Sequence, residues 1–306
     1  WFEYWQERPG TGKRVSDGGV KIVFSDTNTH HRGEANYRTS GVTDAMRIPK
    51  DAFFAHQVMW NGWVSPEKDA TYIVGHWNYK PGTVKKTEYV VSTGDEVELF
   101  VNGKSLGLGE RSNQWLFTWK NVPFEKGKIE AVAYTYYNKK GGKEDFSNKK
   151  SNLTKKETSR YAIETTGEPD HIKLTSIQNP EGFKADGADM ALIQVEVVDK
   201  QGRRCPLDNR TIHFNYQGEM EWIGGIATPN EETKKALAAK KQVLVVNKNE
   251  TAEQKAARKA ADILDSTDSD NTFDNYIHKI DLPVECGVNR VLIRSTVNPG
   301  DIKIYA

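Results

Sequence analysis

Between residues 71 and 134 the apolar residues come in short runs, in which they alternate with polar ones. Turn residues such as Thr93-Gly94-Asp95 separate the runs. Several short alternating runs at this spacing predict an antiparallel β-sandwich. Asn102-Gly103 between two of them predicts a type I′ hairpin turn, because both residues tolerate a positive φ. The predicted strands are 72–74, 89–91, 97–101, 115–119 and 129–134.

A second set of runs after Thr165 predicts another sandwich, with strands at 172–174, 190–198, 212–215 and 291–294. The lysine-rich stretch from Lys139 to Lys156 is typical of a solvated hairpin tip or a linker. Gly224-Gly225-Ile226-Ala227 reads as a glycine-rich loop without the strand-to-helix context of a phosphate site. Residues 231–264 carry an Ala/Lys/Glu-rich helical pattern around a strand-like Val243–Val246, for which we predict no chemical role.

The bulk composition excludes several classes of partner. The formal net charge is +1 over 306 residues, so neither nucleic acid nor an anionic membrane surface is indicated. The longest apolar runs are of strand length, which predicts no membrane-spanning helix. Cys205 and Cys286 are too few for a disulfide framework and lack the spacing of a zinc site. We expect structural thiols, or one cross-strand disulfide if the compartment is oxidising.

The stretch from Val20 to Trp63 has a different pattern. It opens with a short β-branched run ending at Phe24, which predicts a buried strand. A segment dense in hydrogen-bonding side chains follows, and Pro49-Lys50 then predicts the start of a helix that carries Trp60. Strand, polar loop and helix in this order form a βα unit, which places chemistry at the carboxyl end of a parallel strand.

Motifs along the chain resemble glycoside hydrolase family 2, the family of β-galactosidases and β-glucuronidases. His31-Arg32-Gly33-Glu34 and Pro49-Lys50-Asp51-Ala52-Phe53-Phe54 are similar to the end of its catalytic barrel, whereas Thr29-His30-His31 departs from the family pattern. The run from Val97 to Gly107 resembles the immunoglobulin-like domain that follows the barrel. Lys184–Asp189 and the closing 287–304 resemble the terminal invasin-like or immunoglobulin-like domain.

The resemblance implies a mainly β fold. The last βα element of a (β/α)8 barrel would be followed by two antiparallel β-sandwich domains of the immunoglobulin-like type. Residues 1–66 would form the C-terminal end of the TIM-barrel catalytic domain, and 67–164 the first sandwich. Residues 165–306 would form a second, immunoglobulin-like or invasin-like sandwich with a helical insertion near 231–264.

The barrel-like part shows no pair of catalytic carboxylates. Retaining glycoside hydrolysis needs an acid/base carboxyl and a nucleophilic carboxylate about 5 Å apart. Glu3 and Glu7 are spaced as on a solvated helix face, and Asp51 lies in the first turn of the predicted helix, where the helix dipole favours a carboxylate. The resemblance implies that both catalytic glutamates lie upstream of this chain. We therefore expect the chain to contain no catalytic residue and to be inactive alone.

By resemblance, the chain is the C-terminal portion of a retaining exo-β-glycosidase, most like a β-galactosidase, that acts on terminal β-linked sugars. The expected partners are an oligo- or polysaccharide, the remainder of the same enzyme and, as an open alternative, further copies in a homo-oligomer. No cofactor and no metal site are expected, and the expected location is periplasmic or secreted. The alternative is a non-catalytic carbohydrate-binding or adhesive protein built of immunoglobulin-like modules.

Six residues are the candidates for substrate binding. The five loop candidates occupy every second position from Asp26 to Glu34, after the predicted strand. They could therefore hydrogen-bond sugar hydroxyls or an anionic substituent at the pocket mouth. Arg32 and Glu34 could instead form an internal salt bridge that holds the loop. Trp60 could form an aromatic wall of the pocket or seal the junction between barrel and sandwich. The candidates are Asp26, Asn28, His30, Arg32, Glu34 and Trp60.

Overall fold

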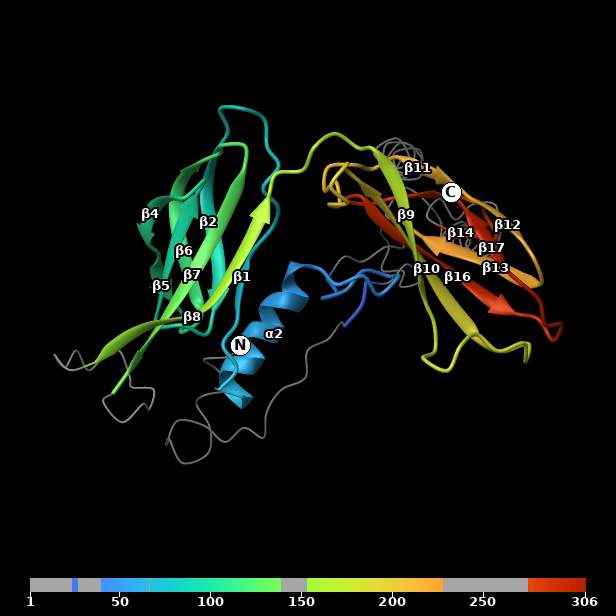
Figure 1. Ribbon diagram of the computed structural model, residues 1–306, viewed down its shortest axis with the longest axis horizontal. Helices are drawn as coiled ribbons and strands as arrows, with labels where there is room; N and C mark the ends of the chain where they lie inside the picture. The colour runs from blue at the N-terminus through green and yellow to red at the C-terminus, as the bar shows by residue number, and fades with distance from the viewer. Residues whose placement is uncertain (1–23, 27–39, 66, 139–152, 228–274) are drawn as a thin grey trace, which may run out of the picture. The chain divides into compact units, whose positions relative to one another are not determined.

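The computed structural model describes residues 24–26, 40–65, 67–138, 153–227 and 275–306 (Figure 1). These residues divide into two compact units, which are described separately. The first contains Phe24 and Pro49–Thr166, and the second contains Ser25–Ile48 and Gly167–Ala306. The predicted mainly β fold is confirmed, because antiparallel strands are the main regular secondary structure of both units.

In the first unit, two four-stranded antiparallel sheets pack face to face. Their strand orders are β1-β2-β6-β5 and β4-β3-β7-β8. Each predicted run between residues 72 and 134 falls on one of these strands, so this part of the prediction is confirmed. The bounds are β1 Thr71–Ile73, β2 Val84–Ser92, β3 Glu96–Val101, β4 Lys104–Leu108, β5 Glu110–Ser112, β6 Leu116–Pro123, β7 Lys128–Tyr137 and β8 Thr154–Glu164.

The predicted hairpin turn joins β3 and β4. Asn102 has a φ of 51° and Gly103 a φ of 81°, which is the pair of positive values that a type I′ turn requires. The lysine-rich stretch from Lys139 ends inside β8, and β7 pairs with β8 up to Tyr137 and Thr154. This pairing favours the hairpin alternative over a linker between domains, although residues 139–152 lie outside the described part.

The core of the first unit lies between its two sheets. In β3, Val97, Leu99 and Val101 are buried while the residues between them are more exposed, as the two-residue period of a strand dictates. The indole of Trp77 is fully buried, and its Nε1–H donates to the carbonyl of Glu125 at 3.0 Å. Burying an apolar side chain of this kind contributes about 1.5–3 kcal/mol. Alternation and burial therefore agree residue by residue.

Helix α2, Asp51–Val64, begins where Pro49-Lys50 predicts and packs against β1 and β2. Its Val58 joins Val91 and Trp115 in a small apolar cluster. At its first turn, the Asp51 carboxylate accepts the Tyr72 hydroxyl at 2.6 Å. The same carboxylate accepts the Gly75 N–H at 3.2 Å. Within the described residues, no helix is long and apolar enough to cross a membrane.

The second unit has a five-stranded antiparallel sheet, in the order β14-β13-β16-β10-β9, and two short strand pairs, β11-β15 and β12-β17. Its core is formed by residues of β10, β13 and β16 together with Ile212, Phe214 and Leu282. The thiol of Cys205 is buried in this core, whereas Cys286 is exposed. The bounds are β9 His171–Ile177, β10 Met190–Val198, β11 Thr211–His213, β12 Asn215–Gln217, β13 Met220–Ile226, β14 Asn275–Ile277, β15 Asp281–Pro283, β16 Val288–Ser295 and β17 Lys303–Tyr305.

The prediction of a glycine-rich loop at Gly224–Ala227 is wrong. Gly224, Gly225 and Ile226 belong to β13 and pair with β14. Gly224 has a φ of 88°, and a Cβ there would clash with the carbonyl of Tyr276. Glycine here marks an irregular strand with close backbone approach, which a sequence does not distinguish from a loop. The predicted helical insertion at 231–264 lies outside the described residues.

A buried ion pair lies in the first unit. Glu88 is 0% exposed, and its two carboxylate oxygens accept the Lys85 ammonium at 2.8 and 2.9 Å. Burial raises the pKa of Glu88 above its ordinary value, although Lys85 and the Tyr89 N–H act in the opposite direction. Burying the ionised Glu88 carboxylate therefore lowers the free energy of unfolding, and the Lys85 ammonium offsets part of this cost.

We expect Lys85→Met to destabilise the first unit by about 3 kcal/mol near pH 7, because a buried carboxylate loses its counter-charge. A carboxyl group whose pKa is raised in the folded state contributes stability at pH values below its ordinary pKa. This contribution is lost as the pH rises through the pKa of the folded state. The loss in Lys85→Met should therefore shrink towards about pH 4, where Glu88 is protonated. Urea unfolding at the two pH values measures this. Exposed Lys86→Met is the control, and an equal loss at both pH values contradicts the explanation.

Candidate functional site

The predicted βα unit from Val20 to Trp63 is divided between the two compact units. Ser25–Ile48 belongs to the second unit, whereas α2 belongs to the first. Val20–Val23, most of the predicted strand, lies outside the described residues. Ser25 forms an isolated parallel bridge with Thr43. The assignment of residues 1–66 to the end of a barrel stays a prediction.

Asp26 is held at the start of the loop by backbone and side-chain contacts. Its N–H donates to the Thr43 carbonyl at 3.0 Å, and its Oδ1 accepts the Gly41 N–H at 2.8 Å. The residue is only 6% exposed. In this geometry the carboxylate connects Asp26 to Gly41, 15 positions further along the chain. Direct contact of Asp26 with a sugar stays a prediction.

Four of the other candidates, Asn28, His30, Arg32 and Glu34, lie outside the described residues. Trp60 is on α2 and is 53% exposed, so part of its ring is accessible from solvent. Asp26 and Trp60 belong to different compact units. Their joint role in one pocket therefore stays a prediction.

Residues 44–48 form a tight turn. The Asp44 N–H donates to the Ile48 carbonyl at 2.9 Å, and the Ile48 N–H donates to the Asp44 Oδ1 at 2.7 Å. Arg47 adopts a φ of 64°, and its guanidinium donates to the Ser25 hydroxyl. Burial raises the pKa of Asp44, and the nearby Glu285 carboxylate raises it further. Arg47 thus joins the turn to Ser25, 22 positions earlier in the chain.

Sequence reasoning missed the residue that connects this turn to the sandwich. Arg290, on β16, donates from Nη1 to the Arg47 carbonyl at 3.0 Å and to the Met46 carbonyl at 3.3 Å. Val42, Met46 and Ile48 are all less than 10% exposed. An arginine on an alternating strand reads as solvent-facing, so no sequence signal distinguishes it. Its role appears only when residues more than 240 positions apart are brought together.

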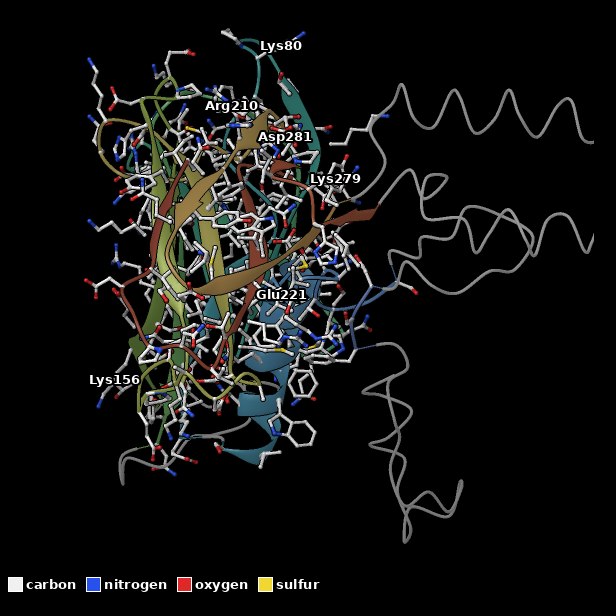
Figure 2. The ribbon with its side chains drawn as sticks, turned by 90° about the vertical axis from the view of Figure 1, so that its right-hand side faces the viewer. Lys80, Lys156, Arg210, Glu221, Lys279 and Asp281 are labelled. Atoms are coloured by element: carbon white, nitrogen blue, oxygen red, sulfur yellow. The ribbon has the colours of Figure 1, made fainter. Side chains whose placement is uncertain are left out.

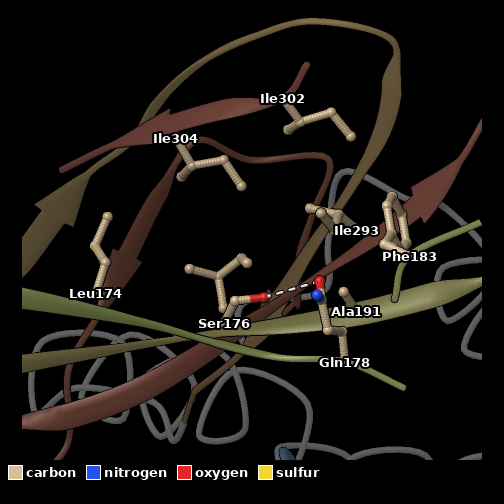
Figure 3. A pocket seen from close by; sticks show the side chains of 9 residues that line it. Leu174, Ser176, Gln178, Phe183, Ala191, Ile293, Ile302 and Ile304 are labelled. Carbon is tan, nitrogen blue, oxygen red and sulfur yellow. Dashed lines mark hydrogen bonds between the residues drawn. The ribbon is translucent and has the colours of Figure 1, made fainter. Parts of the chain in front are cut away.

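A shallow cavity of about 250 Å³ lies in the second unit, next to β9 and β17 (Figure 3). Ser176 and Gln178 are joined there by a hydrogen bond of 3.3 Å (Figure 3). No carboxylate, histidine or cysteine is among the residues that line the cavity, so none of them offers a base to activate the Ser176 hydroxyl. The lining residues are Leu174, Ser176, Gln178, Phe183, Ala191, Ile193, Ile293, Ile302 and Ile304.

Charged side chains outside this cavity form pairs, and Figure 2 labels one member of each of two pairs, Arg210 and Asp281. Arg210 donates to Asp208 at 2.7 Å, and the His213 ring lies 2.8 Å from the Asp281 carboxylate. Among the residues that the structure describes, no three His, Cys, Asp or Glu side chains are grouped to hold a metal ion. Both charge pairs are thus local, each between two side chains of the second unit.

We expect Gly41→Ala to destabilise the second unit by about 2 kcal/mol. An added methyl group would lie 2.7 Å from the Thr43 carbonyl oxygen and closer still to the Asp26 nitrogen, and backbone atoms cannot move aside. The melting temperature of this unit should fall by about 5 °C. Gly300→Ala is the matched control, because nothing lies within 4 Å of its added methyl group. Equal melting temperatures of the two variants contradict this expectation.

Two domain families match the sequence. A domain of unknown function, DUF4982, matches residues 85–140, which run from β2 past the end of β7. Glycoside hydrolase family 2 C-terminal domain 5 matches residues 172–255, which begin in β9. The two matches fall on the two separate sandwiches.

Relatives match over much or nearly all of the chain. A β-glucuronidase of Formosa agariphila is 36% identical over 99% of the chain and 24% of its own length. A β-galactosidase of Bacteroides ovatus is 30% identical over 68% of the chain and 22% of its own length. The chain thus spans about a quarter of the length of these relatives.

Solved structures show the same relationship. The structure of a β-glucuronidase from glycoside hydrolase family 2 matches over 92% of this chain and 23% of its own chain. The TM-score is 0.65 and the sequence identity is 33%. A family 2 structure from Bacteroides cellulosilyticus shares the fold over 88% of this chain and 30% of its own chain. The TM-score is 0.60 and the sequence identity is 20%. The chain therefore belongs to glycoside hydrolase family 2 and has the sequence of its C-terminal region.

Proposed function

We propose that the chain forms the C-terminal part of a retaining exo-β-glycosidase that hydrolyses terminal β-linked sugars of oligo- or polysaccharides. The observation that carries this proposal is the 36% identity to a β-glucuronidase over 99% of the chain. In the proposed enzyme, residues 1–66 end the catalytic barrel. Residues 67–164 and 165–306 are the immunoglobulin-like domains that follow it.

The catalytic glutamates of the proposed enzyme lie upstream of Trp1. The contacts of the described carboxylates up to residue 65 support this. Asp26 accepts the Gly41 N–H, Asp44 accepts the Ile48 N–H, and Asp51 accepts the Tyr72 hydroxyl and the Gly75 N–H. Each of these three groups holds local structure, so none is offered as nucleophile or acid. The chain's part in the reaction is to shape and hold the pocket rim.

The sugar is proposed to be a β-galactoside or a β-glucuronide, with the galactoside as first choice. The names of the relatives include both activities. A glucuronide would add a carboxylate that needs a cationic partner, and Arg32 is the candidate for that contact. We propose a periplasmic or secreted location and action as a single polypeptide or homo-oligomer.

The test compares the proposed full-length enzyme with the isolated 306-residue chain. Nitrophenyl β-galactoside and nitrophenyl β-glucuronide are the two substrates, and nuclear magnetic resonance follows the anomer that is released first. We expect the full-length enzyme to release the β-anomer from one substrate, because two successive displacements retain configuration. We expect no turnover by the isolated chain.

Three outcomes would contradict the proposal. Turnover by the isolated chain would place the catalytic carboxylates within these residues. Release of the α-anomer would exclude a glycosyl-enzyme intermediate. Binding of oligosaccharides without turnover by the full-length protein would favour the carbohydrate-binding or adhesive alternative. A full-length variant with its upstream glutamates changed to glutamine is the matched inactive control.

A further inference from the structure

The guanidinium of Arg290 is fixed by its neighbour across the sheet. Gln194 on β10 lies directly opposite Arg290 on β16 in the strand register. The Gln194 Oε1 accepts Arg290 Nε at 3.0 Å and Nη2 at 2.8 Å. Two bonds to one acceptor on a rigid strand orient the guanidinium, so that little freedom is lost when its remaining N–H groups bind.

The third guanidinium nitrogen, Nη1, donates hydrogen bonds to the carbonyls of Met46 and Arg47 in the turn. Two acceptors 244 and 243 positions away in sequence therefore share one cationic donor. Hydrogen bonds to a charged group contribute more to stability than neutral hydrogen bonds do. Arg290 is thus a strong attachment point for the turn.

The charges around Arg290 favour its cationic form. Burial lowers the pKa of Arg290, whereas the carboxylates of Asp44 and Glu196 raise it. Glu285 is the further carboxylate that acts on Asp44. These three carboxylates come from the turn, from β10 and from the residues before β16. The Asp44 carboxylate in the turn and the Glu196 carboxylate on β10 are therefore the charges that favour the cationic guanidinium.

The attachment extends from the turn to Asp26. Arg47 donates to the Ser25 hydroxyl, and that hydroxyl donates to the Asp44 carbonyl at 3.0 Å. Thr43, next to Asp44, accepts the Asp26 N–H, and Gly41 donates to the Asp26 carboxylate. Asp26 and Gly41 are the described residues that flank most closely the predicted sugar-contacting residues Asn28, His30, Arg32 and Glu34 in the sequence.

We propose that Arg290 is a positioning residue of this glycosidase. It holds the turn 44–48 on the second unit and, through Ser25 and Thr43, thereby fixes Asp26 and Gly41. The inference rests on the proposed function for its link to substrate. The hydrogen bonds themselves are independent of that function. The terminal sandwich is then part of the substrate-binding apparatus, although it contributes no catalytic group.

The test measures amide hydrogen exchange in the 306-residue chain and kinetics in the proposed full-length enzyme. We expect Arg290→Met to speed exchange at residues 41–48 by about tenfold or more, with exchange in the core strand β10 unchanged. In the full-length enzyme the KM should rise by about tenfold, with kcat changed by less than about twofold, because the defect lies in substrate contact. Arg290→Lys keeps the positive charge on a single donor nitrogen, so its exchange rate and KM should lie between those of the wild type and Arg290→Met.

Arg294→Gln is the matched control. Arg294 lies on the same strand, 43% exposed, and pairs with Glu221, which is labelled in Figure 2. Both exchange and kinetics should stay at wild-type values in this variant. Gln194→Leu serves as a second variant, which frees the guanidinium while leaving its charge, and should speed exchange to a smaller extent.

Unchanged exchange at residues 41–48 in both Arg290→Met and Gln194→Leu would overturn the proposal. So would faster exchange with an unchanged KM, because the attachment would then have no bearing on substrate. If the wild-type enzyme lacks glycosidase activity altogether, the proposed function fails. The exchange measurement still decides in that case whether Arg290 holds the segment.

Discussion

The pleat of the antiparallel strands is the constraint on which the rest of this structure depends. It sends alternate side chains to opposite faces, so each strand supplies one apolar row to a core and one polar row to the outside. On β10, Ile193 and Val195 enter the core while Gln194 between them meets Arg290 on the outer face. The same alternation therefore builds both the sandwich and the surface that holds Ser25–Ile48.

Irregular segments in both units are attached by one charged side chain that satisfies otherwise exposed polar groups. In the first unit, Asp51 accepts the Tyr72 hydroxyl and the Gly75 N–H and so fixes the start of α2. In the second unit, Arg290 donates to the carbonyls of Met46 and Arg47. Charge-assisted bonds are about twice as strong as neutral ones, and they add to the packing of buried side chains such as Val58 on α2 and Met46 in the turn. The sandwiches thus provide both stability and attachment.

In the proposed exo-acting glycosidase, these attachments would support the substrate pocket. An exo-acting glycosidase must hold its pocket rim within a fraction of an ångström, which needs rigid support behind the residues that touch the sugar. A segment anchored to a sandwich core is better suited to that task than a free loop. In the proposed enzyme the C-terminal region is a support for chemistry performed by upstream residues.

The sequence by itself determined the strand-rich architecture, the hairpin at Asn102-Gly103, the start of α2 and the family. These depend on periodicity, on turn residues and on motifs, all of which are local in the chain. The sequence interpretation failed at Gly224, where a strand needs a glycine for close approach to Tyr276, and it assigned no role to Arg290. The folded structure was needed to show that the buried Asp26 carboxylate accepts the Gly41 N–H and that Arg290 binds the carbonyls of Met46 and Arg47. Both roles arise from contacts between residues distant in sequence, and no local pattern records which backbone groups a folded side chain will reach.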